Sequence, residues 1–259
     1  MVKGLYTAYT GMLNEQNRMD IMTNNLANAS TVGYKKEGST SQSFDDVLTV
    51  KIKDKSVGLR NAQKIGIKNP GVKIGENYTD YSQGSFRITG NTYDLALSGE
   101  GFFAIEFTNK AGETDTKYTR AGQFTLNKDG YLVTEEGDYV LDTQNRRIRL
   151  NTLIDSSITD DGTIYQNGQA IAKIQVTDFA DYDYLEKYGE TYYQPIQGAQ
   201  TIASNAQVKS GYLEMANVQI VSEMVNLISI TRAYESNQKV VQTIDDTLDV
   251  AVNQIGRVQ

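Results

Sequence analysis

Hydrophobic positions near the end of the chain repeat at a spacing of seven residues. Within residues 217–256 this row comprises Ile220, Leu227, Tyr234, Val241, Leu248 and Ile255. A second row three residues on comprises Ile230, Ile244 and Ala251, and Glu223 and Asn237 interrupt it. Because no Pro or Gly occurs before Gly256, the pattern predicts one long amphipathic helix with a narrow seam of the coiled-coil type. We expect Asn217 to cap its start and Gly256 to end it.

The beginning of the chain carries a row of the same spacing. Leu5, Met12, Met19 and Leu26 recur every seven residues, and Ala8 and Met22 fill the row three further on. This pattern predicts a helix over residues 4–28. The two terminal helices could pack on a central core, as in an ordinary soluble domain. Their narrow seams favour the other interpretation, in which they pair as a coiled coil outside that core.

The middle of the chain shows a different pattern. Residues 36–77 are polar, with scattered Gly and one Pro, and indicate an extended linker segment. From residue 78 to residue 207 the apolar positions alternate between turn signals, which predicts a mainly antiparallel β body. Residues 124–126 and 131–133 flank Asn127-Lys128-Asp129-Gly130, a strong hairpin signal.

Further strands and turns are predicted within this body. Residues 95–97 and 102–105 form two apolar runs with a tight connection between them. Turns over residues 159–165 and 166–169 precede a strand over residues 172–176. No long helix is predicted in this part of the chain.

The fold class is therefore mixed α and β. We expect a terminal helical domain formed by residues 1–35 and 208–259, the linker over 36–77, and the β body over 78–207. Chain ends that meet in a coiled coil, with a β body looped out between them, suit a subunit that builds an axial tube.

Composition excludes several kinds of chemistry. The chain has no Cys and no His, which removes thiolate and histidine nucleophile systems and most transition-metal sites. A net charge of −7 argues against nucleic acid as a partner. No apolar run approaches the roughly 20 residues needed to span a bilayer, so we expect no membrane insertion. Residues 1–7 do not have the continuous apolar stretch of a cleaved secretory signal.

Candidate site residues are better explained as structure. Residues 127–130 and 159–162 lack the ligand spacing of calcium loops and fit hairpin turns. The acidic pairs at 45–46, 135–136 and 245–246 are sequence neighbours, which do not face one another across a cleft, so they indicate solvated surface. Five tyrosines within residues 179–193 suit either a subunit contact or an ordinary sheet edge. We predict no catalytic residue, no metal site and no cofactor.

Three groups of residues carry a resemblance to a known family. They are Asn24-Asn25-Leu26-Ala27-Asn28 with Thr31, Gly33, Tyr34 and Lys35; Asp94-Leu95-Ala96-Leu97, Gly101-Phe102-Phe103 and Tyr118-Thr119-Arg120-Ala121-Gly122-Gln123-Phe124; and Gly211-Tyr212-Leu213-Glu214, Glu223-Met224-Val225-Asn226-Leu227-Ile228 and Arg232-Ala233-Tyr234-Glu235. On these residues nearly the whole chain resembles the bacterial flagellar basal-body rod and hook proteins, and most closely the distal rod members. The most specific part of this resemblance is a signature turn, formed by Asn24, Asn25, Leu26, Ala27, Asn28 and Gly33.

The resemblance implies a structural role without catalysis. It implies that the terminal helices stack around a narrow channel in a helical homopolymer, with neighbouring rod and hook proteins as further partners. It implies export by the flagellar type III apparatus without a cleaved signal, and a place in the basal body outside the cytoplasmic membrane. The seam residues are then the expected assembly interface.

Two alternatives remain at the level of sequence. Residues 142–151 are basic where the family more usually has a Pro-containing apolar stretch, which leaves a proximal-rod or hook paralogue open. A carbohydrate-binding or carbohydrate-active β protein, whose tyrosines contact glycan, is the alternative of another class.

Overall fold

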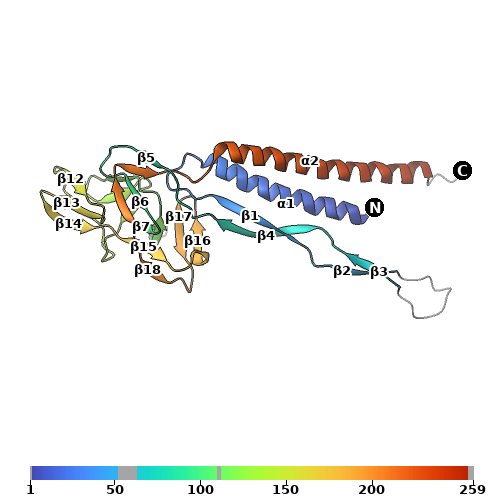
Figure 1. Ribbon diagram of the computed structural model, residues 1–259, viewed down its shortest axis with the longest axis horizontal. Coiled ribbons are helices and arrows are strands. Elements are labelled where there is room, and N and C mark those ends of the chain that lie inside the picture. Colours follow the sequence, from blue (N-terminus) through green and yellow to red (C-terminus); the bar gives the residue numbers. More distant parts are fainter. Residues whose placement is uncertain (1, 52–62, 110–111, 256–259) are drawn as a thin grey trace. The chain divides into compact units, whose positions relative to one another are not determined.

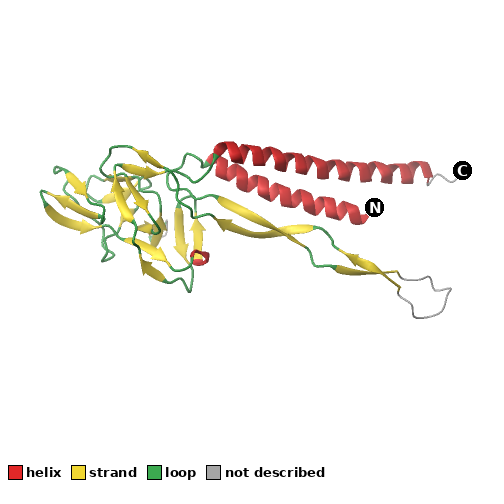
Figure 2. Ribbon diagram, in the orientation of Figure 1, coloured by secondary structure: helices red, strands yellow, loops and turns green. Residues whose placement is uncertain are grey.

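The structure, a computed structural model, describes residues 2–51, 63–109 and 112–255 (Figures 1 and 2). The chain forms two compact units. The helical unit comprises Met1–Leu26, Glu37–Asp80 and Ile220–Gln259. The β unit comprises Ala27–Lys36 and Tyr81–Gln219. Each unit is described by itself below.

Both predicted terminal helices are present in the helical unit. Helix α1 spans Val2–Ala27, and helix α2 spans Ile220–Val250 and ends in a π-helical turn over Ala251–Ile255. The two helices run in opposite directions beside each other (Figure 1). A Cβ atom added to Gly11 would lie 2.9 Å from Nδ2 of Asn237, and one added to Gly4 would lie 3.5 Å from Cδ1 of Ile244. Glycines at these positions therefore allow the two backbones to approach closely.

The predicted cap of the second helix is wrong. The helix begins at Ile220, three residues after Asn217. The side chain of Asn217 instead accepts a hydrogen bond from the backbone N–H of Lys36 at 2.7 Å and donates to the hydroxyl of Ser82 at 3.0 Å. An Asn before a helix often caps it by accepting a hydrogen bond from a backbone N–H of the first turn. Here the side-chain oxygen of Asn217 is bonded to the distant N–H of Lys36 instead. The predicted end at Gly256 lies outside the described residues.

Residues 37–51 and 63–79, within the predicted extended linker, form an antiparallel ribbon. Strand β1 (Glu37–Ser43) pairs with β4 (Val72–Thr79), and β2 (Val47–Lys51) pairs with β3 (Gln63–Lys68). The ribbon contacts α1 through polar groups, because the Thr7 hydroxyl donates to the carbonyl of Pro70 and the Ser41 hydroxyl donates to Oδ1 of Asn14. This packing explains why a polar, weakly patterned segment is ordered beside a helix.

The β unit is built on one large antiparallel sheet. Its strands run in the order β16-β17-β8-β7-β11-β10-β9, and β15 pairs with both β7 and β18. The bounds are β7 Phe102–Thr108, β8 Thr114–Thr119, β9 Phe124–Leu126, β10 Leu132–Thr134, β11 Tyr139–Val140, β15 Val176–Phe179, β16 Leu185–Tyr188, β17 Tyr192–Pro195 and β18 Thr201–Ala203. The predicted hairpin around residues 127–130 is confirmed as β9 and β10.

Smaller sheets complete this unit. Strands β12 (Ser156–Ile158), β13 (Thr163–Gln166) and β14 (Gln169–Lys173) form a three-stranded sheet. Strand β5 (Phe86–Ile88) pairs with β20 (Tyr212–Glu214), and β6 (Leu95–Ser98) pairs with β19 (Gln207–Ser210). The only described helix in this unit is the short 3-10 turn η1 over Tyr182–Tyr184.

The predicted strand over residues 172–176 is wrong, because the chain changes sheet within it. Strand β14 ends at Lys173, and β15 begins at Val176 in the large sheet. Between them, Ile174 bridges Asp142 and the N–H of Gln175 donates to the carbonyl of Leu141. Local alternation continues through this point, so the sequence pattern does not reveal the change.

Two hydrophobic clusters form the core of the β unit. One includes Leu95, Phe103, Phe124 and Ile148, in which the rings of Phe103 and Phe124 meet edge to face at 5.2 Å. The other lies around Phe102 and includes Tyr118, Leu141, Phe179, Leu185 and Tyr193. Adjacent residues Phe102 and Phe103 thus serve opposite faces of the sheet, as expected for a strand buried on both sides.

The compact units divide the chain differently from the expected domains. Residues 27–36 and 208–219 lie with the β strands, because Lys35, Lys36 and Gly33 bond to residues 214–217. Residues 37–80 lie with the helices, because their ribbon bonds to α1.

We predict that Phe103→Ala costs about 3–5 kcal/mol of unfolding free energy, because the ring is fully buried and its loss leaves a cavity. Ile171→Ala, at an exposed position of β14, is the control and should stay within about 0.5 kcal/mol. Chemical denaturation followed by tyrosine fluorescence measures both. Equal losses in the two variants would contradict this core assignment.

Candidate assembly interface

The less exposed residues of α2 follow the predicted seam over most of its length. Apart from Thr231 and Ala233, they are Glu223, Leu227, Ile230, Tyr234, Asn237, Val241, Ile244, Leu248 and Ala251. The spacing alternates between four and three residues, which is the heptad pattern. Glu223 and Asn237, the expected interruptions, thus lie in the same stripe. Ile220 is exposed, and the side chain of Ile255 lies outside the described part of the chain.

Helix α1 is covered on two sides. Leu5, Met12, Met19 and Leu26 are all half-buried. The contacts with α2 come one position earlier, at Gly4 and Gly11, whereas Thr7, Thr10 and Asn14 face the ribbon. The predicted N-terminal row therefore lies at the margin of the helix contact within this chain, and its role in assembly stays a prediction.

The helical unit leaves large apolar side chains exposed on both helices and on the ribbon. They include Tyr6, Tyr9 and Leu13 on α1; Val221, Met224, Val225 and Ile228 on α2; and Val47, Leu48, Ile67, Ile74 and Tyr78 on the ribbon. Val221 alone is 77% exposed. Exposed apolar residues gathered in this way indicate surfaces that another protein covers.

The signature turn connects α1 to β1 and to the β unit. Asn25 is fully buried, and its side chain exchanges two hydrogen bonds with the backbone of Glu37, at 2.7 and 2.9 Å. Asn28 accepts from the N–H and the hydroxyl of Thr31, both at 3.1 Å. Asn24 and Ala27 are exposed at the surface, and Leu26 is half-buried.

Gly33 of this turn has a requirement of its own. Its φ angle is 70°, and its N–H donates to the carbonyl of Glu214 at 2.8 Å. A Cβ atom there would lie 2.3 Å from the backbone nitrogen of Ala121. The backbone passes so close to its neighbour that only glycine fits.

A buried ion cluster next to the turn was not predicted from the sequence. Nζ of Lys35 donates to Oε1 of Glu214 at 2.7 Å, and Nη1 of Arg120 lies 3.4 Å from Oε2. The N–H of Gly84 donates to the same carboxylate at 3.0 Å. All three charged side chains are at most 3% exposed. Each had been noted within a family motif, but only tertiary structure brings them together.

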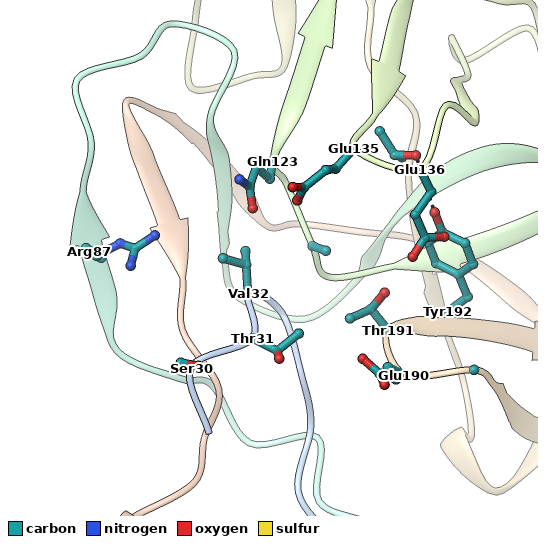
Figure 3. A pocket seen from close by; sticks show the side chains of 13 residues that line it. Ser30, Thr31, Val32, Arg87, Gln123, Glu135, Glu136, Glu190, Thr191 and Tyr192 are labelled. Atoms are coloured by element: carbon teal, nitrogen blue, oxygen red, sulfur yellow. Dashed lines mark hydrogen bonds between the residues drawn. The ribbon is translucent and has the colours of Figure 1, made fainter. Parts of the chain in front are cut away.

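A cavity of about 620 Å³ lies beside the signature turn in the β unit. Figure 3 shows Ser30, Thr31 and Val32 along one side and Glu135 and Glu136 on another, with Glu190 apart from that pair, beside Thr191. Arg87 lies on the wall across from these carboxylates (Figure 3). Four charged side chains and several hydroxyl groups contribute to this lining, so the cavity offers bonding groups to a polar ligand.

The hydroxyl of Tyr192, a residue that lines this cavity, lies in a polar cluster with Thr134 and Asp138. The hydroxyl of Tyr192 donates to Oδ2 of Asp138 at 2.9 Å and lies 3.3 Å from that of Thr134. Burial raises the pKa of Asp138 despite the hydrogen bond from Tyr192, and burial also raises the pKa of Tyr192. Tyr192 therefore stays protonated at physiological pH and donates this hydrogen bond.

Neither metal binding nor membrane crossing finds support among the described residues. They contain no group of three or more acidic, His or Cys side chains arranged to hold a metal ion. None of their helices combines the length and the hydropathy needed to span a bilayer.

We predict that Glu214→Ala costs about 3–5 kcal/mol of unfolding free energy, because it leaves Lys35 and Arg120 buried without their carboxylate. The control is Asp161→Ala, which breaks the exposed pair with Lys173 and should cost at most about 1 kcal/mol. Thermal and chemical unfolding of both variants gives the comparison. A Glu214→Ala variant as stable as the control would mean that the cluster does not hold this region.

Comparison with known proteins covers all three parts of the chain. The profile described as "Flagella basal body rod protein" matches residues 5–35, and "Flagellar hook protein FlgE/F/G D1 domain" matches residues 96–166. "Flagellar basal body rod FlgEFG protein C-terminal" matches residues 209–255. The first and last of these contain the signature turn and α2, and the middle one contains the central strands of the large sheet.

Full-length relatives agree with these matches. The flagellar basal-body rod protein FlgG of Bacillus subtilis is 34% identical, over 98% of this chain and 99% of its own length. The flagellar hook-basal body complex protein FlhO of the same organism is 31% identical over the full length of both chains. The flagellar basal-body rod protein FlgF of Caulobacter vibrioides is 30% identical, again over the full length of both. Similarity of this extent, along the whole chain, shows that the chain belongs to the bacterial flagellar basal-body rod protein family.

Proposed function

We propose that this structural rod subunit polymerises with copies of itself into the helical rod that connects the flagellar motor to the hook. Its mechanism is assembly, and torque passes through the contacts between subunits. The observation that carries the proposal is the set of exposed apolar side chains on α1, α2 and the ribbon. Burial of apolar surface between subunits would supply the free energy of polymerisation.

The terminal helices would form the inner, coiled-coil part of this polymer. The heptad stripe from Glu223 to Ala251 supports this pairing, as does the close approach of Gly11 to Asn237. Within one chain the stripe is only partly covered, since Leu227, Tyr234 and Val241 remain half-exposed. Neighbouring subunits would complete that coverage. A contact between different surfaces of successive subunits does not close, so it generates a helical tube.

We place the chain with the distal rod members of the family. Phe44-Asp45-Asp46-Val47-Leu48 and Arg232-Ala233-Tyr234-Glu235 support this placement. Relatives named FlgG and FlgF are both close to 30% identical, so identity does not separate the paralogues. Export through the flagellar type III apparatus without a cleaved signal, to the space outside the cytoplasmic membrane, belongs to the same proposal.

A carbohydrate-binding protein finds less support in the tyrosine-rich segment. Tyr192 and Tyr193 are buried, and Tyr182 packs against the rings of Tyr81 and Phe102. Tyr184 and Tyr188 are each 42% exposed, and Lys117 covers the ring of Tyr188. A sugar platform needs flat rings open to solvent, so these residues serve the sheet instead.

We expect the helical unit to be less protected than the β unit in a free monomer. Hydrogen exchange at a concentration too low for assembly should show fast exchange in α1 and α2 and slow exchange in β7 and β8, because the helices bury little surface within one chain. Circular dichroism on the same sample should show helix content rising with assembly. Equal protection of helices and strands in a monomer would contradict the view that the helices are assembly elements.

We predict that Leu227→Asp or Met12→Asp abolishes polymerisation and swimming while the β unit stays folded. A carboxylate in a seam that becomes buried on assembly has no partner there, and burying it is costly. Leu153→Asp, at a position of the β unit that is 92% exposed, is the matched control. Electron microscopy of rods and a motility assay report the outcome. Normal rods in either seam variant would show that these residues do not form the interface.

A further inference from the structure

Strand β11 carries turns of opposite charge at its two ends. The turn before it is closed by hydrogen bonds between Thr134 and Asp138 and carries Glu135 and Glu136. The turn after it is closed by the N–H of Asp142 donating to the carbonyl of Arg146 at 2.8 Å. Strand β11 spans Tyr139–Val140, and among the described residues the two turns are not paired with each other across it: Arg146 forms its ion pair at 3.4 Å with Asp142, within its own turn.

The acidic turn forms one wall of the cavity beside the signature turn. Glu190, from the connection between β16 and β17, adds a third carboxylate to the lining, beside Thr191 (Figure 3). Within the described part of the chain, none of these three carboxylates takes part in an ion pair. Arg87 is the cation nearest in the lining, and it lies on the other side of the cavity (Figure 3). The cavity thus offers a concave site with an excess of negative charge.

The basic turn projects its arginine into solvent. The side chain of Arg146 is 69% exposed, and it forms an ion pair with Asp142 at 3.4 Å. Asn145, just before it, has a φ angle of 55°, which sets the tight bend that presents the arginine. Arg147, by contrast, is bonded to Glu106 and stacked over Tyr139, so it is held on the sheet. An exposed pair like that of Arg146 and Asp142 contributes little, so Arg146 can exchange partners at low cost.

We propose that Arg146 of one copy docks into the acidic cavity of the next copy, between Glu135, Glu136 and Glu190. A guanidinium can bond to carboxylates in a fork geometry, which gives direction as well as attraction. Because donor and acceptor lie at opposite ends of β11, each copy offers one of each and the contact repeats head to tail. The inference rests on the proposed self-assembly and adds to it a contact between β units that is separate from the helix seam.

Charge reversal tests this contact in the purified full-length chain. Arg146→Glu and Glu135→Arg should each raise the concentration needed for half-maximal assembly by about tenfold or more, because like charges then face each other. The combined Arg146→Glu and Glu135→Arg variant should restore assembly to near the unmodified level. Lys128→Glu changes the net charge by the same amount as Arg146→Glu, at an exposed position of another turn, and should have little effect.

Disulfide trapping gives a second measurement, because the natural chain has no cysteine. A chain with Glu135→Cys and Arg146→Cys should form covalent multimers upon mild oxidation of assembled protein, whereas Glu135→Cys with Lys128→Cys should remain monomeric. Assembly of Arg146→Glu at the unmodified concentration, or absence of covalent multimers, would overturn the Arg146 contact and leave the rod function intact. Loss of assembly that the combined variant does not restore would also overturn it and would point to another partner for Arg146. Failure of the unmodified chain to assemble at all would instead count against self-polymerisation.

Discussion

The buried carboxylate of Glu214 is the contact on which the order of the β unit depends. It binds Lys35, Arg120 and the backbone of Gly84, while its own carbonyl binds Gly33. Lys35 follows the segment that leaves α1, and Glu214 precedes the segment that enters α2. A charge buried to this degree is tolerated only with its partners, so neither segment can shift alone. The segments that follow α1 and precede α2 in the chain are thereby joined within the β unit.

The helical unit has the opposite character. Within the chain, α1 approaches α2 at Gly4 and Gly11, and a few hydrogen bonds join α1 to the ribbon. Many apolar side chains of this unit are exposed to solvent. In the proposed polymer, other subunits would cover these side chains. The well-packed β unit would keep its shape, and burial of the helices' apolar surface would drive association.

Charge can add direction to an association that hydrophobic burial drives. Apolar contacts tolerate sliding and rotation, whereas ion pairs between defined side chains fix the register between partners. Opposite charges at the two ends of β11 would give each β unit a polarity along that strand. Glu135, Glu136 and Glu190 line the cavity beside the signature turn. The backbone of that turn passes so close to Ala121 that position 33 must be glycine.

The sequence by itself determined the elements whose pattern is local. Heptad spacing predicted both helices, alternation with Asn-Asp-Gly turns predicted the hairpin of β9 and β10, and the asparagine-rich turn identified the family. These features depend on residues within one or two turns of each other, where side-chain direction follows directly from backbone geometry.

Only the tertiary structure decided the contacts between distant residues. Glu214 contacts Lys35 and Arg120, which lie 179 and 94 positions away in the sequence. Asn217 does not cap the second helix, because its side-chain oxygen accepts a hydrogen bond from the backbone N–H of Lys36. The ribbon over residues 37–51 and 63–79 forms hydrogen bonds with α1, and the residues predicted as one strand over 172–176 are divided between two sheets. Long-range pairing depends on which surfaces the folded chain brings together and on the cost of closing the intervening loops. Neither the choice of contacting surfaces nor the cost of loop closure produces a periodic pattern in the sequence.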